Sequence, residues 1–159
     1  MDQLTALRTE VYAVLEGQRD PAERYEGFLH LNAVSQAAAL LAARRALDGT
    51  LCMAAGLLHD IYSFRTLEEA DHAARGAWEA AGLLQRSGFA LADAEIVCQA
   101  VRRHSDKAAI DGPYDECLKD ADVLAHWLTE PGKAFEPPKV ARIQAVMAEL
   151  GLKGTIRTK

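Results

Sequence analysis

The sequence has few cysteines and no long apolar run, and both absences narrow the class of protein. Its 159 residues include three cysteines, Cys52, Cys98 and Cys117, which lie far apart and form no C-x-x-C pair. An odd, dispersed set argues against a disulfide framework and against a zinc–thiolate site. We therefore expect small buried apolar side chains at these positions. No uncharged apolar run reaches the roughly 18 residues of a membrane span, so no membrane association is expected.

A basic surface and a targeting segment are also missing. The formal net charge is −5, and the lysines and arginines form no stripe. Because neutralisation of phosphates supplies most of the affinity for nucleic acids, a long nucleic acid is not an expected partner. A small phosphate ester needs only a few local cations. The first residues, MDQLTALRTEVYAVLEG, lack the basic region and cleavage site of a signal peptide, so a cytoplasmic protein is expected.

No segment alternates polar and apolar residues over a strand length, and helical periodicity dominates instead. The sequence therefore predicts an all-α fold, a compact bundle of six to eight helices without a sheet. The length fits one domain over residues 1–159. A last helix is expected over residues 138–150, followed by a frayed tail over residues 152–159.

Motifs for nucleophilic catalysis are absent too: there is no G-x-S-x-G, no Walker A and no catalytic cysteine motif. The unusual feature is AAGLLHDIYSF, residues 54–64, where His59 and Asp60 stand in an apolar segment. An ionised carboxylate in a poorly solvated place needs a charge or strong donors beside it. His59 could be a hydrogen-bonded core histidine, and a simple Asp–His pair would satisfy both side chains. A divalent cation would satisfy them better, because it holds several ligands at once.

Further ligands for such a cation must come from other helices. Candidates are His30, His104 at the end of VRRH, and Asp122 in LKDADVLAH. A mixture of imidazoles and carboxylates suits Mn, Fe, Co, Ni or Zn, whereas Mg prefers oxygen ligands.

The order of these residues resembles the HD-domain superfamily of metal-dependent phosphohydrolases. The matching stretches are RYEGFLHLNAVSQAAALLA, AAGLLHDIY and LKDADVLAH, so the resemblance covers roughly residues 24–130. It implies an HD-domain-like helical bundle. It also implies a divalent metal held by four ligands: His30, His59, Asp60 and Asp122.

Many members of this superfamily bind a second metal through two additional histidines. Here His72 and His104 hold comparable positions, which implies a possible second metal with Asp60 as the bridge between the ions. The spacing departs from that of the HD-GYP group, and Tyr62 replaces its signature glycine. Hydrolysis of cyclic di-GMP is therefore not carried over. His72 as a solvent-exposed helix residue remains the alternative.

The reaction that fits these residues is hydrolysis of a phosphate ester of a nucleotide or other small metabolite by metal-activated water. Catalytic roles are expected for Asp60, which could orient the water, for His104 and for Lys107. Side chains near the site that could contact the substrate are Arg24, Tyr62, Lys107 and Lys119.

Several alternatives stay open. The protein could instead be a non-catalytic, metal-containing regulatory or ligand-binding HD module, and a homodimer is possible. Asp120 could hydrogen-bond a ligand histidine or lie in solvent. His126 lies one helical turn after Asp122 and could support the site, but the sequence favours packing beside Trp127.

Overall fold

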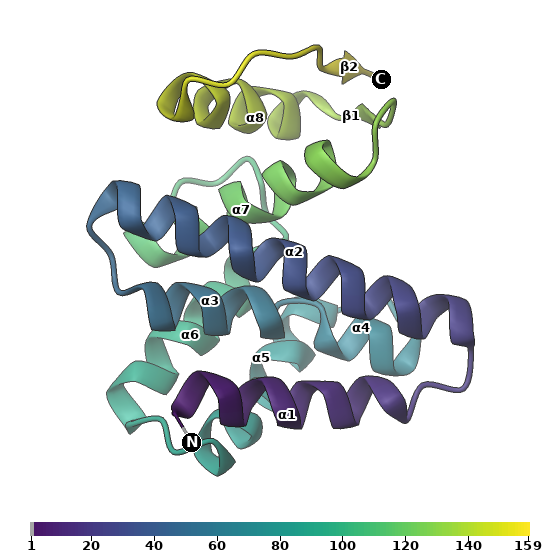
Figure 1. Ribbon diagram of the computed structural model, residues 1–159, viewed down its shortest axis with the longest axis vertical. Helices are drawn as coiled ribbons and strands as arrows, with labels where there is room; N and C mark the ends of the chain where they lie inside the picture. Colours follow the sequence, from purple (N-terminus) through teal and green to yellow (C-terminus); the bar gives the residue numbers. More distant parts are fainter. Residues whose placement is uncertain (1) are drawn as a thin grey trace.

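Eight α-helices and two short strands follow one another along residues 2–159, the part of the chain described by the computed structural model (Figure 1). In chain order they are α1 (Gln3–Glu16), α2 (Pro21–Arg45), α3 (Gly49–Leu58), α4 (Ile61–Thr66), α5 (His72–Arg86), α6 (Leu91–Arg103), α7 (Pro113–Thr129), β1 (Ala134–Phe135), α8 (Pro137–Leu150) and β2 (Arg157–Thr158). The all-α class expected from the sequence is confirmed.

The first three helices begin at aspartate caps. The carboxylates of Asp2, Asp20 and Asp48 each accept backbone N–H bonds from the first turn of the helix that follows. These bonds satisfy donors that a helix cannot satisfy internally. The caps fix where α1, α2 and α3 start, and thereby which residues face the core.

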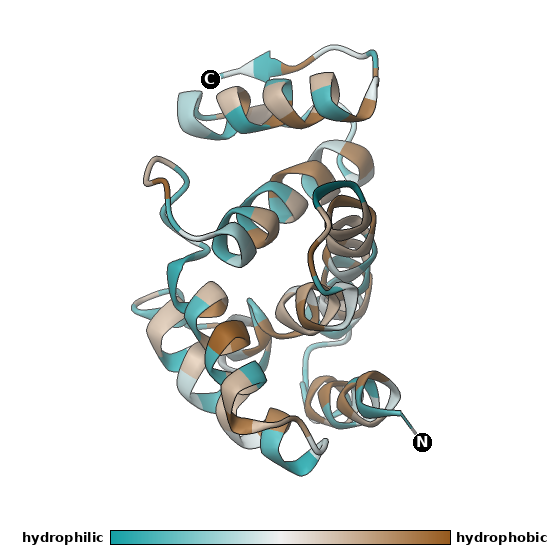
Figure 2. Ribbon diagram, turned by 90° about the vertical axis from the view of Figure 1, so that its left-hand side faces the viewer, coloured by the Kyte–Doolittle hydropathy of each residue, from teal (hydrophilic) through white to brown (hydrophobic). Residues whose placement is uncertain are grey.

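The long helix α2 lies along both α3 and α7, and α5 packs on α6 (Figure 1). Apolar and polar segments alternate along the helices (Figure 2). The main core consists chiefly of leucine, alanine and valine side chains. Cys52 and Cys117 are buried in it, Cys98 is half-buried, and all three are free thiols. Among residues 2–159, no helix combines the length and the apolar character needed to cross a membrane.

Helices α2 and α3 lie close together at Gly56 and Ser35. A Cβ atom built there would lie 2.6 Å from the Cα of Ser35 and 2.7 Å from its backbone nitrogen. Only glycine therefore allows these two backbones to pack at this distance. The contact matters for function because α2 carries His30 and α3 leads directly into His59.

Two expectations for the C-terminal region are wrong. Residues 152–159 are not frayed, and the chain contains a minimal sheet, in which β1 pairs in parallel with β2. The indole N–H of Trp127 donates to the Thr155 carbonyl at 3.1 Å, and Ile156 packs on a second apolar cluster between α7 and α8. The tail covers an apolar surface formed by side chains of α7, β1 and α8. The spacing of apolar residues in the sequence does not show that these side chains come together.

Deletion of residues 152–159 should therefore destabilise the protein rather than leave it unchanged. The loss of the Trp127 hydrogen bond and of the Ile156 contacts is expected to lower the free energy of unfolding by about 1–2 kcal/mol. Chemical denaturation would measure this, and the fluorescence of Trp127 should shift to the red in the truncated protein. Identical denaturation curves and spectra for both proteins would mean that the tail does not pack.

Candidate metal centre

The histidines of the centre stand mostly at helix ends. His59 directly follows α3, His104 directly follows α6, and His72 is the first residue of α5. The chain turns within the apolar segment of residues 54–64, because α3 ends at Leu58 and α4 begins at Ile61. Asp60 adopts φ −115° and ψ 16°, so it turns between α3 and α4. This turn aims Asp60 and His59 into the same space.

A shared contact orients three of the imidazoles. His59, His72 and His104 each bring Nδ1 to the carbonyl oxygen three residues earlier, at 2.9, 2.9 and 2.6 Å. A carbonyl oxygen only accepts, so each Nδ1 carries the hydrogen. Nε2 is then left with its lone pair facing inward, the state required of a metal ligand.

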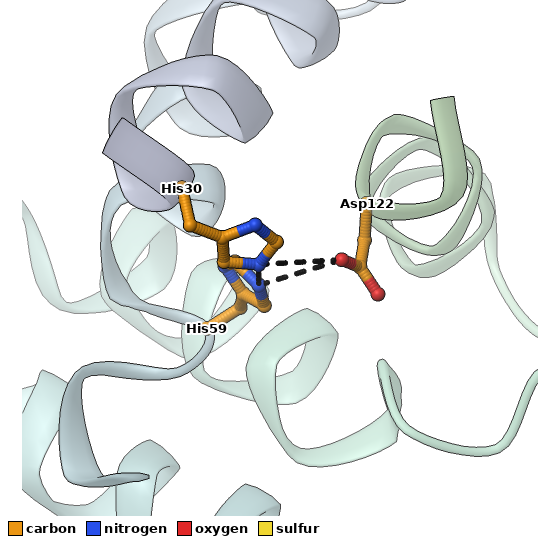
Figure 3. Close-up of side chains that lie close together, drawn as sticks. All are labelled: His30, His59 and Asp122. Atoms are coloured by element: carbon orange, nitrogen blue, oxygen red, sulfur yellow. Dashed lines mark hydrogen bonds and ion pairs between the residues drawn. The ribbon is translucent and has the colours of Figure 1, made fainter. Parts of the chain in front are cut away.

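His30, His59 and Asp122 point toward one another from α2, the end of α3 and α7 (Figure 3). The two Nε2 atoms lie 3.0 Å apart, and the Oδ1 atom of Asp122 lies 3.5 Å from His30 and 3.8 Å from His59. Two donors that share one cation at bonds of about 2.1 Å are separated by roughly 3–4 Å. Oδ1 of Asp122 is buried and has no hydrogen-bond partner. These residues therefore fit a divalent cation.

Asp60 lies between this group and a second pair of histidines. Its Oδ2 atom is 3.7 Å from Nε2 of His30 and 3.3 Å from that of His59. Its Oδ1 atom is 3.1 Å from Nε2 of His104 and 3.5 Å from that of His72. His59, Asp60 and His104 form a second group with the spacing of metal ligands. The structure thus brings together all six side chains named as ligands for one or two metals.

Burial and neighbouring charges keep His30 neutral. Burial is the main cause that lowers its pKa to about 3, and the adjacent His59 adds to the effect. The pKa of His59 is shifted the other way: burial lowers it, but the charges of Asp60 and Asp122 and the contact with the Gly56 carbonyl together outweigh burial and raise it. The opposite pKa shifts of His30 and His59 fit one proton shared between their Nε2 atoms. Binding of a cation displaces that proton.

The two carboxylates are held ionised. Burial would raise the pKa of Asp122, but the Lys107 ammonium and the neighbouring imidazoles outweigh it and hold that pKa below its ordinary value. Asp60 behaves alike, since His59 and His104 overcome the effect of burial on its pKa. Burial lowers the pKa of His104, so its imidazole is neutral near pH 7. The centre therefore combines two anionic carboxylates with neutral imidazoles, a set of ligands that suits a divalent cation.

Lys107 lies at this centre, but its ammonium is occupied. Nζ is buried, donates to the His104 carbonyl at 2.6 Å and pairs with Oδ2 of Asp122 at 2.6 Å. The sequence suggested that Lys107 grips a substrate phosphate from the helix end. In the structure it fixes the Asp122 carboxylate so that Oδ1 faces the imidazoles.

The other three side chains suggested as substrate contacts lie off the centre. Tyr62 lines a hollow with Arg65 and Arg75, whose guanidinium groups lie over its ring, and its hydroxyl donates to Glu68 at 2.6 Å. Arg24 lies in the first turn of α2 with its guanidinium over the Tyr25 ring. Neither side chain is joined to the metal-ligand cluster by a hydrogen bond or an ion pair.

Lys119 is completely buried. Its ammonium pairs with Asp111 at 2.6 Å and donates to the Ala109 carbonyl at 2.9 Å. It thereby ties down the connection between α6 and α7. The sequence did not foresee this, because a lysine on a charged helix normally reaches solvent.

Lys119→Met should consequently lower stability without weakening metal binding. Loss of the buried hydrogen bonds is expected to cost about 1–3 kcal/mol in the free energy of unfolding. Denaturant unfolding and metal affinity would be measured beside Lys153→Met, which changes an exposed lysine. A variant with native stability but impaired turnover would instead place Lys119 in contact with the substrate.

His126 also belongs to the centre, against the expectation that it packs beside Trp127. Its Nε2 atom lies 3.5 Å from Oδ1 of Asp122, and its ring centroid lies 4.5 Å from that of His30. The signal in the sequence was its position one turn after Asp122. Asp120, by contrast, neither supports a histidine nor lies in solvent, because it forms ion pairs with Arg45 and Arg142.

A cavity of about 250 Å³ opens beside Asp60. Its lining combines two glutamates with apolar and hydroxyl side chains: Glu23, Asp60, Ser63, Phe64, Leu67 and Glu69. A larger cavity of about 760 Å³ lies elsewhere, between α1, α5 and the start of α6, and its lining is mainly apolar. Asp60 lines the smaller cavity, whereas no side chain of the histidine–carboxylate cluster lines the larger one.

Fold and site together define an all-helical protein with a histidine–carboxylate centre suited to divalent cations. The sequence profile of the HD domain matches residues 27–127, a range that contains all the side chains of both ligand groups. This chain belongs to the HD-domain family, within a superfamily of metal-dependent hydrolases.

Structural comparison supports this assignment. The crystal structure of a predicted HD superfamily hydrolase from an uncultured Thermotogales bacterium is similar, with a TM-score of 0.59 and 26% sequence identity. The similarity covers 90% of this chain and 88% of the other. A search of curated proteins gives no match to this chain.

Proposed function

We propose that the protein is a two-metal phosphohydrolase that cleaves a phosphate ester of a nucleotide or other small metabolite. The observation that carries this proposal is the position of Asp60, whose two oxygens face two different pairs of imidazoles at 3.1–3.7 Å. A carboxylate in this position can bridge two cations. Paired cations stabilise both the attacking and the leaving oxygen of an in-line displacement at phosphorus.

When bound, the cations supply an activated water as nucleophile and neutralise charge on the phosphoryl oxygens. The protein contributes orientation. The backbone carbonyls behind His59, His72 and His104 hold the imidazoles in place, and Lys107 holds Asp122. Asp60, which lines the cavity, would orient the attacking water. The imidazole-rich donor set favours Mn, Fe, Co, Ni or Zn over Mg.

The cavity beside Asp60 supports a small substrate with a single phosphate. Glu23 and Glu69 place negative charge at its rim, and this charge repels the additional phosphates of a triphosphate. Phe64 and Leu67 offer apolar surface for the organic part of the ester. We therefore expect monophosphates to be hydrolysed faster than triphosphates or cyclic diesters.

The test is a substrate screen on protein stripped with a chelator and then reloaded with Mn, Fe, Co, Ni, Zn or Mg. Release of phosphate would be measured from p-nitrophenyl phosphate and from nucleoside mono-, tri- and cyclic phosphates. The expected result is turnover that requires an added transition metal and is fastest with monophosphates. A protein that binds metal but releases no product from any ester would be a binding module instead.

A further inference from the structure

Three imidazoles, not two, surround the unpartnered oxygen of Asp122. Nε2 atoms of His30, His59 and His126 lie 3.5, 3.8 and 3.5 Å from Oδ1. Hydrogen bonds from these rings would be near 2.8–3.0 Å, and Oδ1 is buried without any hydrogen-bond partner. The distances from Oδ1 to the three Nε2 atoms instead match those between ligand atoms of one cation. His126 lies about as far from Oδ1 as His30 and His59, the two histidines that the HD-domain resemblance implies as ligands.

His126 is oriented by its own acidic partner. Its Nδ1 atom makes a short hydrogen bond with a carboxylate oxygen of Glu130, which follows the last residue of α7. The Lys133 ammonium lies 2.8 Å from both oxygens of Glu130 and holds that carboxylate in place. A carboxylate accepts, so Nδ1 is the donor and Nε2 keeps its lone pair on the side of Asp122. A carboxylate behind a ligating histidine is the common support of metal-bound imidazoles.

We propose that His126 is an additional metal ligand, which joins His30, His59 and Asp122 at the first cation, and that Glu130 positions it. The proposal rests on the proposed function only in requiring that the centre bind a divalent cation. It extends the donor set at this cation to three imidazoles, which gives the first position a stronger preference for transition metals than the second. It also accounts for the Glu130–Lys133 pair, which lies behind His126 just past the end of α7.

The experiment uses the full chain and Zn²⁺ alone, so that it does not depend on turnover. Imidazole ¹⁵N chemical shifts would be recorded by NMR during titration of the metal-free protein with Zn²⁺, and the His126 signals would be assigned with His126→Gln. Zn²⁺ affinity would be measured in parallel by competition with a chelator. Glu130→Gln is the second variant. Glu136→Gln is its matched control, because Glu136 is exposed and forms an ion pair with Lys159, away from the centre.

The expected result is a coordination shift at Nε2 of His126 together with those of His30 and His59. His126→Gln should weaken binding of Zn²⁺ by more than tenfold, and Glu130→Gln by about tenfold, with Glu136→Gln unchanged. If Zn²⁺ shifts His30 and His59 but leaves His126 unshifted, the proposal is wrong. Metal binding through His126 in a protein that hydrolyses no ester would support this inference and contradict the proposed function, whereas failure to bind any metal would contradict both.

Discussion

Asp60→Asn is expected to reduce hydrolysis at least about 10³-fold and to weaken metal binding about a hundredfold or more. The side chain is the one carboxylate that faces both histidine groups within residues 2–159. An amide carries no charge, and its two ends cannot both act as anionic donors. Asp60→Asn therefore weakens binding at both cation positions, whereas substitution of a single histidine weakens binding at one.

Helix content should survive this substitution, because Asp60 makes no side-chain cap for α4 and its side chain is 24% exposed. Circular dichroism would check the fold, elemental analysis the metal content and phosphate release the turnover. Asp71→Asn is the matched control, since Asp71 is exposed, precedes His72 and makes no cap hydrogen bond. Unchanged turnover in Asp60→Asn would rule out the proposed mechanism.

The clustering of side chains at this site was predictable because it places histidines and carboxylates where an apolar core would exclude them. His59 and Asp60 in an apolar segment signalled a cluster before any geometry was known. The matching order of His30, these two residues and Asp122 then indicated the family and the all-helical fold. Patterns of this kind depend on residue identity, which the sequence states directly.

The features that escaped prediction depend on tertiary contacts instead. No glycine or proline next to Asp60 indicates the break between α3 and α4. Lys119 is buried because Asp111, in the loop directly before α7, folds back onto its ammonium. The C-terminal tail is ordered because it contacts Trp127 and pairs with β1. His126 was assigned to packing beside Trp127, since helical spacing alone does not show that its ring turns toward His30.

Gly56→Ala should strongly destabilise the protein, although alanine is the better helix former. The added Cβ would lie 2.6 Å from the Ser35 backbone, a distance that no side-chain rearrangement can relieve. Helices α2 and α3 must then separate. Overpacking of this kind costs typically about 1–3 kcal/mol, and a backbone clash belongs at or above the upper end. The gain in helix propensity, about 1 kcal/mol, does not compensate.

Gly49→Ala in the same helix is the matched control, because nothing lies within 4 Å of a Cβ atom built there. It should leave stability unchanged or raise it by up to about 1 kcal/mol. Denaturant unfolding of the metal-free variants separates the two cases, and equal stability would mean that α2 and α3 do not pack at Gly56.

Metal affinity should fall in Gly56→Ala as well. The carbonyl of Gly56 accepts the Nδ1 hydrogen of His59, and the clash moves that carbonyl away from the helix that carries His30. The two Nε2 atoms, now 3.0 Å apart, would be displaced relative to each other. A loss of Zn²⁺ affinity in Gly56→Ala and not in Gly49→Ala would show that one small residue sets both the packing of these helices and the spacing of the first ligand pair.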